Sequence, residues 1–286
     1  MKNKENGVFS VVMSFMPDSV RLEIERLSVR PDEIRLRAYG VCAVVARGRN
    51  LALSARVCQE DMRRILKSVC DMAVYAHRDD ICRGYVAIAG GGRVGVVGHA
   101  KYEGGRLCGI SDVISLVFRI PSGECSFGPS LYREWQKKRS GMLICSPAGC
   151  GKTTAIRYLA GKIGGGESPM RVAVVDERCE FDLSSYSGAM VDVLRGYRRA
   201  VGVEIAIRTI SAEVLIVDEI GTREDSDALL GAVGAGVTVI ATAHGRGAEE
   251  ARRRECIKTL CDAGLFDTYA AISRENGQFF LNFSET

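Results

Sequence analysis

A short stretch in the second half of the chain carries residues that bind phosphate. It reads Ser146-Pro-Ala-Gly-Cys-Gly-Lys-Thr-Thr154, follows the apolar run 141–145 and precedes a helical pattern at 155–160. Backbone N–H groups of such a loop and of the helix N-terminus converge on one point, which favours a bound phosphate. Lys152 would pair with β- and γ-phosphate oxygens as a point charge, and the Thr153 hydroxyl would hold a Mg²⁺ ion that bridges them.

The match to a phosphate-binding loop departs from the strict pattern at its first position. That position is a glycine in the strict pattern and Ser146 here, whereas Gly149 and Gly151 remain. A chance glycine turn before a helix is the alternative, but the required strand, loop and helix are all present in order. We therefore assign nucleotide binding to Ser146, Pro147, Ala148, Gly149, Cys150, Gly151, Lys152, Thr153 and Thr154.

The apolar run 213–217 ends in two carboxylates, Asp218 and Glu219. Such a run is typical of a buried parallel strand, whose C-terminal tip would face the nucleotide. Asp218 would anchor Mg²⁺ through its water shell, so Thr153 and Asp218 are the predicted metal-binding residues. Glu219 would orient and deprotonate the attacking water.

A second apolar run, 171–175, ends in the same way at Asp176 and Glu177, with Glu180 close behind. We expect these acids at the same sheet edge as Asp218. Two roles are open for these acids: one of them is a supporting general base, or together they form an ion-pair network with Arg178 that only shapes the loop.

A third run, 236–241, leads to Thr242 and His244. A polar group at a third strand tip can sense the γ-phosphate by hydrogen bonding and couple its loss to movement. A lone histidine at a strand end is more often structural, but its place beside the other strand tips favours the sensor.

A phosphoryl-transfer site also needs a cation on the developing charge, and a neighbouring subunit can supply it. The candidates for this cation are Arg195, Arg198, Arg199 and Arg208. We prefer Arg208, because 205–211 resembles a helix or extended turn just before the Asp218 strand. Whether Arg208 acts in cis or in trans stays open. The predicted catalytic residues are thus Glu219, Glu177, His244 and Arg208.

Composition limits the class of protein. With 286 residues, 47% of them hydrophobic, the chain is long enough for two ordinary domains. No apolar run reaches membrane-span length and the N-terminus lacks a signal-peptide core, so we expect a cytoplasmic protein. The eleven cysteines are scattered without CxxC or zinc spacing, which indicates reduced thiols. A net charge of +4 is too mild to indicate nucleic-acid binding.

The periodicity is interrupted at 121–129, where prolines and glycines cluster. We therefore divide the chain into an N-terminal domain, 1–125, and a P-loop domain, 126–286. The N-terminal part is predicted to be α+β, with a helix whose apolar face comprises Met62, Ile65, Leu66, Val69, Met72 and Ala73. Its predicted strands are 33–37, 41–45, 84–89, 93–97 and 115–120. Near the C-terminus, 270–283 is predicted to form a hairpin that extends the sheet of the P-loop domain and turns at Asn276-Gly277.

Taken together, the motifs resemble those of the stage III sporulation protein AA family. The resemblance rests on Pro147–Thr154, Val175–Arg178, Val217–Gly221 and Ala241–Gly245 in that order, and on Ile34–Arg37 and Gly91–Gly95 in the N-terminal part. It covers nearly the whole chain. Members are ATPases similar to the secretion and pilus-motor ATPases.

The resemblance implies roles for individual residues. Lys152 and Thr153 match the Walker A residues, and Asp218 and Glu219 match the Walker B pair. The acidic box is matched by Glu177 and Glu180, and the histidine box by His244.

The resemblance also implies a fold and a setting. The fold is an α/β, RecA-like P-loop NTPase domain, with a mainly parallel sheet flanked by helices, preceded by a smaller α+β domain. The cofactors are ATP and Mg²⁺. The protein is expected on the mother-cell side of an endospore-forming bacterium, peripheral to the membrane, as a homo-oligomer in which a hexameric ring is possible. Its partners would be membrane-embedded proteins of a sporulation channel.

Two other functions fit parts of the sequence. A nucleic-acid-dependent ATPase would grip a strand with the arginine-rich N-terminal half, although interspersed Asp and Glu make a solvated surface the better interpretation. A nucleotide-binding scaffold without hydrolysis is the third, and Glu219 argues against it.

Overall fold

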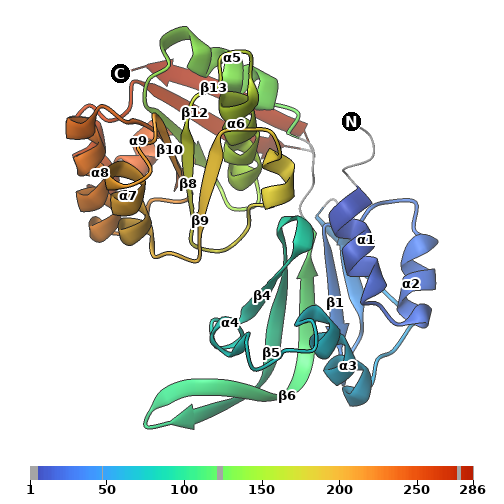
Figure 1. Ribbon diagram of the computed structural model, residues 1–286. Coiled ribbons are helices and arrows are strands. Elements are labelled where there is room, and N and C mark those ends of the chain that lie inside the picture. Colours follow the sequence, from blue (N-terminus) through green and yellow to red (C-terminus); the bar gives the residue numbers. More distant parts are fainter. Residues whose placement is uncertain (1–5, 47, 121–124, 276–277, 286) are drawn as a thin grey trace. The chain divides into compact units, whose positions relative to one another are not determined.

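The computed structural model describes residues 6–46, 48–120, 125–275 and 278–285 (Figure 1). The chain divides into two compact units, residues 1–122 and residues 123–286. Our boundary between residues 125 and 126 stays a prediction. None of the helices formed by the described residues has both the length and the hydropathy of a membrane span.

The first unit is an α+β domain built on one antiparallel sheet. Its strands have the order β3-β2-β1-β6-β5-β4. The side chains of β1, β2 and β4 alternate between a buried and a more exposed face, and the buried side chains form one core with the helices. The strands are β1 (Glu33–Arg37), β2 (Ala43–Ala46), β3 (Arg49–Ala52), β4 (Tyr85–Ile88), β5 (Gly92–Glu103) and β6 (Arg106–Arg119). The helices are α1 (Asn6–Ser14), α2 (Asp18–Glu25), α3 (Gln59–Val69), α4 (Arg78–Cys82) and the short η1 (Ala89–Gly91).

Two expectations for this unit are corrected. Helix α3 ends at Val69, so Met72 and Ala73 do not continue its apolar face; Met72 has a left-handed backbone (φ 65°) and is 74% exposed. Strands β5 and β6 are also longer than predicted, since they pair out to Glu103 and Arg106. Beyond Val97 most of β5 is exposed on both faces, so no alternation of apolar residues marks it.

The second unit is an α/β domain around a seven-stranded sheet of order β13-β12-β7-β11-β10-β8-β9. The strands from β12 to β9 are parallel, and β13 pairs with β12 antiparallel. The strands are β7 (Met142–Ser146), β8 (Val172–Asp176), β9 (Val191–Arg195), β10 (Val214–Val217), β11 (Thr238–His244), β12 (Thr268–Glu275) and β13 (Gln278–Glu285). The predicted C-terminal hairpin is confirmed in its strands, while its turn at 276–277 lies outside the described residues.

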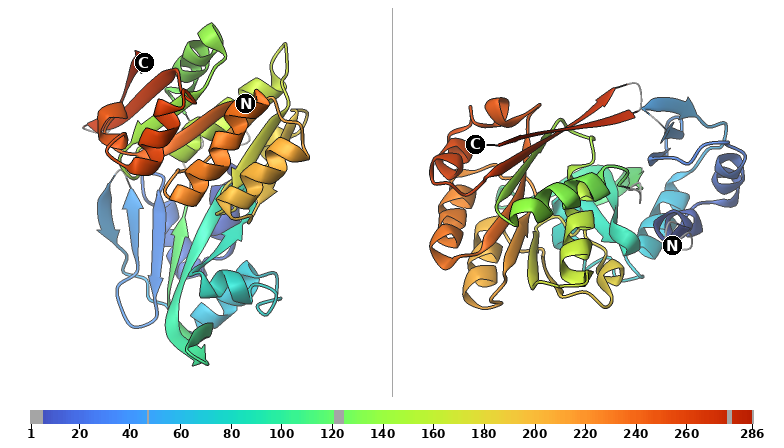
Figure 2. Two further views of the ribbon diagram at one scale, coloured as in Figure 1. Left: turned by 90° about the vertical axis from the view of Figure 1, so that its left-hand side faces the viewer. Right: turned by 90° about the horizontal axis from the view of Figure 1, so that it is seen from above.

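Helices cover both faces of this sheet (Figure 2). Residues Met142 and Ile144 of β7 pack towards α5 and α6, whereas Leu143 and Cys145 pack towards α7, α8 and α10. Strands buried on both faces require the continuous apolar runs that the sequence shows. The helices are α5 (Gly128–Lys138), α6 (Lys152–Gly165), η2 (Leu183–Tyr186), α7 (Arg199–Arg208), α8 (Arg223–Ala235), α9 (Ala248–Ala251) and α10 (Glu255–Asp262).

Candidate nucleotide-binding site

The predicted phosphate-binding loop connects β7 to α6. Gly149 (φ 76°) and Gly151 (φ 88°) have left-handed backbones that only glycine adopts without strain. Ser146 is the last residue of β7 and is buried, and its hydroxyl donates to the Pro147 carbonyl at 2.9 Å. Ser146 does not need a positive φ, so a side chain fits at the position where the strict pattern has glycine.

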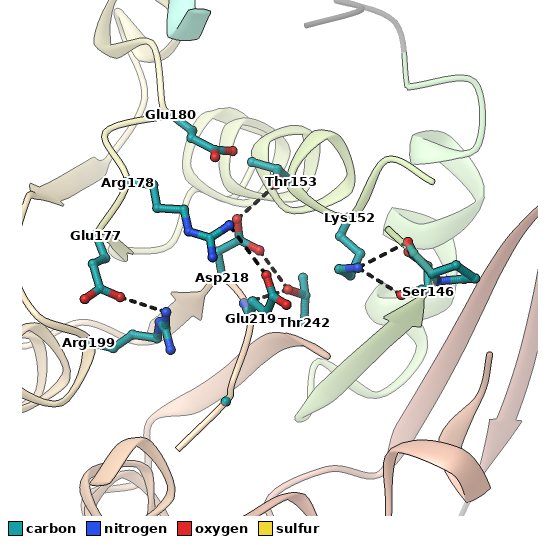
Figure 3. A network of polar contacts seen from close by, with 12 residues as sticks. Ser146, Lys152, Thr153, Glu177, Arg178, Glu180, Arg199, Asp218, Glu219 and Thr242 are labelled. Carbon is teal, nitrogen blue, oxygen red and sulfur yellow. Dashed lines mark hydrogen bonds and ion pairs between the residues drawn. The ribbon is translucent and has the colours of Figure 1, made fainter. Parts of the chain in front are cut away.

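Lys152 begins helix α6 and folds back over the loop (Figure 3). Its Nζ donates to the carbonyl oxygens of Ser146 at 2.9 Å and Pro147 at 3.3 Å. These acceptors are neutral, so they do not cancel the charge of the ammonium group. The cation therefore lies at the mouth of the loop beside the N-terminus of α6, where an anion is favoured.

Asp218 follows β10 and joins the loop to the neighbouring strand. Its Oδ2 accepts from Thr153 Oγ1 at 2.9 Å, and its Oδ1 accepts from Thr242 Oγ1 at 2.8 Å (Figure 3). Thr242 lies on β11, which pairs with both β7 and β10. Three segments far apart in sequence thus bring two hydroxyls and one carboxylate together.

The backbone of Glu219 is fixed by a hydrogen bond, whereas its side chain is partly exposed. Its φ is 50°, a left-handed conformation that is unusual for a residue with a side chain, and its N–H donates to Thr242 Oγ1 at 2.7 Å. The carboxylate Oε2 lies 3.7 Å from Nη1 of Arg178, and both side chains are partly exposed. The long ion pair and the partial exposure leave the Glu219 carboxylate accessible to solvent.

Glu177 belongs to a tighter network centred on Arg199, the first residue of α7. One guanidinium nitrogen lies 2.7 Å from Glu177 Oε2, and another lies 2.7 Å from Asp225 Oδ2. The same Asp225 oxygen accepts the N–H groups of Gly221 at 3.1 Å and Thr222 at 3.0 Å, which caps α8. Arg199 therefore ties the tip of β8 to the start of α8.

Asp176 organises the loop that carries Glu177. Its two carboxylate oxygens accept the N–H groups of Glu180 and Phe181, each at 2.8 Å. Burial raises the pKa of Asp176, and these two hydrogen bonds oppose that shift. Glu180 is itself buried, and Arg157 donates to its carbonyl. The ion pairs of this segment differ from the expected network with Arg178, because Glu177 pairs with Arg199 and Arg178 pairs with Glu219.

A small cleft gathers these side chains at the carboxyl edge of the sheet. It is lined by Asp176, Glu177, Arg178, Arg199, Asp218 and Glu219. Asp225 was not predicted, although Thr222 and Asp225 at i and i+3 form the capping-box pattern that precedes α8.

Two predicted residues lie elsewhere. His244 ends β11 opposite Ser146 in the ladder, so it neighbours the loop, and its side chain is exposed. Arg208 is the last residue of α7 and is exposed. Helix α7 starts after the tip of β9 and leads back to the start of β10, which places Arg208 at the opposite edge of the sheet from Asp218. Within one chain, Arg199 and not Arg208 is the arginine of α7 at the cleft.

Comparisons with known proteins agree with this architecture. The family described as sporulation stage III, protein AA matches residues 5–279. The stage III sporulation protein AA of Bacillus subtilis (strain 168) is 35% identical over 275 residues, which cover 93% of this chain and 87% of that protein. The uncharacterized protein ycf45 of Cyanidium caldarium is 29% identical over 143 residues, 46% of this chain and 41% of that protein.

Solved structures show the same fold at low identity. The ATPase DotB of Legionella pneumophila has a TM-score of 0.61 and 16% identity, with 88% of this chain and 76% of that one covered. The pilus retraction motor PilT, solved with bound ADP, has a TM-score of 0.64 and 18% identity, with 92% and 80% covered. The fold is therefore a RecA-like P-loop domain preceded by a smaller α+β domain, as the sequence predicted.

Proposed function

We propose that this chain, which belongs to the sporulation stage III protein AA family, binds ATP at the loop 146–154 and hydrolyses it with Mg²⁺. The 2.9 Å hydrogen bond from Thr153 Oγ1 to Asp218 Oδ2 carries the proposal. A P-loop ATPase needs a loop hydroxyl beside a strand-tip carboxylate, because both serve one metal ion.

The two groups fit Mg²⁺ by their chemistry. Thr153 and Asp218 offer hard oxygen atoms at the end of the phosphate-binding loop, and Mg²⁺ prefers oxygen ligands while keeping several waters. A bound Mg²⁺ ion would neutralise charge that develops on the β- and γ-phosphate oxygens. Thr242 orients the Asp218 carboxylate by its hydrogen bond to the other oxygen.

The chain's own residues bind and orient the triphosphate. The N–H groups of the loop and of the first turn of α6 donate to phosphate oxygens, since helix starts leave such groups unpaired. Lys152 exchanges its contacts with the carbonyls of Ser146 and Pro147 for contacts with phosphate oxygens. Because both carbonyl acceptors are neutral, Lys152 gives them up at a lower cost in free energy than it would need to break an ion pair with a carboxylate.

Glu219 is the proposed general base, and Glu177 a supporting residue. Glu177 is bound by Arg199 at 2.7 Å, and Arg199 is bound in turn by Asp225. Glu219 stands 3.7 Å from Arg178, whose side chain is about half exposed and can move away. Glu219 is therefore the more available carboxylate to accept a proton from water.

We further propose that the protein is a motor of the secretion-ATPase type that assembles as a homo-oligomer, and that it energises a channel between mother cell and forespore. The family membership supports the sporulation setting. Arg208 lies away from the cleft of its own subunit, so any contact it makes with a reacting phosphate would be in a neighbouring subunit.

ATP hydrolysis measured with Mg²⁺ over a range of protein concentrations tests this function. A rate per mole of protein that rises with concentration would support a site completed by assembly. No hydrolysis at any concentration, with or without added membrane, would contradict the proposed activity.

A further inference from the structure

Two phenylalanine rings lie against the phosphate-binding loop at Gly151. The ring centroids of Phe127 and Phe279 are 5.3 Å apart. A Cβ atom built on Gly151 would be 3.1 Å from Cζ of Phe127 and 4.0 Å from Cε1 of Phe279. Both rings therefore border the space into which a side chain at Gly151, the residue just before Lys152, would project.

The hairpin of β12 and β13 brings Phe279 to this place. Strand β12 pairs with β7 over Thr268–Ala271 and then continues to Glu275, past the end of the β7 ladder. Strand β13 returns with Phe279 opposite Arg274. The far end of the hairpin thus extends beyond the strand that leads into the loop.

The Phe279 side chain is more exposed to solvent than the Phe127 ring beside it. Phe127 is buried, whereas Phe279 is 36% exposed. The guanidinium carbon of Arg274 lies 5.3 Å from the centre of the Phe279 ring. Two flat groups, one aromatic and one cationic, therefore meet at the surface beside the loop, and purine bases stack on both kinds of group.

The order of the strands tells which end of a nucleotide would lie here. The carboxylates and Thr242 all lie on one side of β7, on β11, β10 and β8 or directly after them. The reacting γ-phosphate must face that side. The ribose and base, at the other end of the triphosphate, then face the opposite side of β7, which is formed by β12 and β13.

We propose that Phe279, together with Arg274, is the platform on which the base of the bound nucleotide stacks. This assignment rests on the proposed function of the loop as an ATP site. Phe279 and Arg274 would then make the affinity for a nucleoside triphosphate higher than the affinity for a polyphosphate without a base. Because stacking accepts any aromatic base, the platform contributes affinity for ATP and GTP alike.

Calorimetric titration of the full-length protein with Mg²⁺-ATP and with Mg²⁺-tripolyphosphate tests the platform. Phe279→Ala should weaken ATP binding roughly tenfold, the usual order for loss of one stacked base, and leave tripolyphosphate binding unchanged. Phe279→Trp should keep ATP affinity within about twofold of the parent, since it retains a stacking face. Arg274→Ala should lower ATP affinity by a smaller factor.

Phe280→Ala is the matched control. Phe280 is 44% exposed on the same strand but points to the opposite face, so its loss should change neither titration. A Phe279→Ala protein that binds ATP as tightly as the parent would overturn the platform, as would equal losses for ATP and tripolyphosphate. A parent protein that binds neither compound would instead overturn the proposed ATP site.

Discussion

The hydroxyl of Thr242 donates to Asp218 Oδ1 at 2.8 Å, across the neighbouring strands β11 and β10. The Thr242 hydroxyl oxygen also accepts the backbone N–H of Glu219 at 2.7 Å, and the threonine side chain is fully buried. One hydroxyl therefore holds two acidic residues, Asp218 by its side chain and Glu219 by its backbone.

Replacing Thr242 by valine should separate this role from packing. The change keeps the shape but leaves the Glu219 N–H and one Asp218 oxygen without that partner, which costs about 1–3 kcal/mol. We expect a lower unfolding temperature and a reduced rate of ATP hydrolysis, measured by calorimetry and phosphate release. Thr242→Ser should recover most of the activity; a fully active Thr242→Val protein would argue against the bridge.

Lys152→Ala should abolish measurable ATP binding, because the loop loses the cation at its mouth. Direct titration with nucleotide checks this. Lys162→Ala is a suitable control, since Lys162 lies on the same helix but stacks over Tyr158. Unchanged affinity in Lys152→Ala would remove the phosphate-binding role of the loop.

Glu219→Gln should retain ATP binding and lose hydrolysis by about 10²–10⁴-fold, because the amide keeps the shape but cannot accept the proton of water. Single-turnover hydrolysis measures the effect. Glu177→Gln should slow turnover less, since Glu177 is engaged by Arg199. The reverse order of effects would assign the base to the tip of β8.

His244→Ala should leave ATP binding nearly intact, since Lys152, Thr153 and the loop amides make most of the phosphate contacts. If His244 senses the γ-phosphate, the variant should show one protease-digestion pattern with ATP and with ADP, where the parent shows two. A variant that still distinguishes the two nucleotides, and still supports sporulation, would make His244 a structural residue.

Cysteine reactivity should follow burial. Burial raises the pKa of Cys145, just before the loop, to about 12, and that of Cys125 to about 12. At pH 8 a thiol of that pKa is ionised in roughly one molecule in ten thousand, and the thiolate is the reactive form. Mass spectrometry after brief alkylation of the native protein should find exposed Cys58 modified first. Early modification of Cys145 would indicate that β7 opens.

Local sequence patterns were sufficient for much of the architecture. The apolar runs before Ser146, Asp176 and Asp218 are strands β7, β8 and β10, and Gly149 and Gly151 adopt the left-handed backbone that the loop requires. These features depend on neighbours in the chain, because burial on both faces demands a continuous apolar run and a tight turn demands glycine. The exposed arm of β5 and β6 and the short strand β9 were missed, because neither carries a buried apolar pattern.

The sequence by itself determined the strand, glycine loop and helix around residues 146–154, the acidic strand tips and the RecA-like class. Only the tertiary structure decided which other side chains meet: Thr242 with Asp218 and Glu219, Arg199 rather than Arg208 at the cleft, and Phe279 beside the loop. Those pairings follow from the strand order β12-β7-β11-β10-β8 and from the direction in which α7 runs. Both are set by long-range packing of the sheet and its helices, which spacing along the chain does not encode.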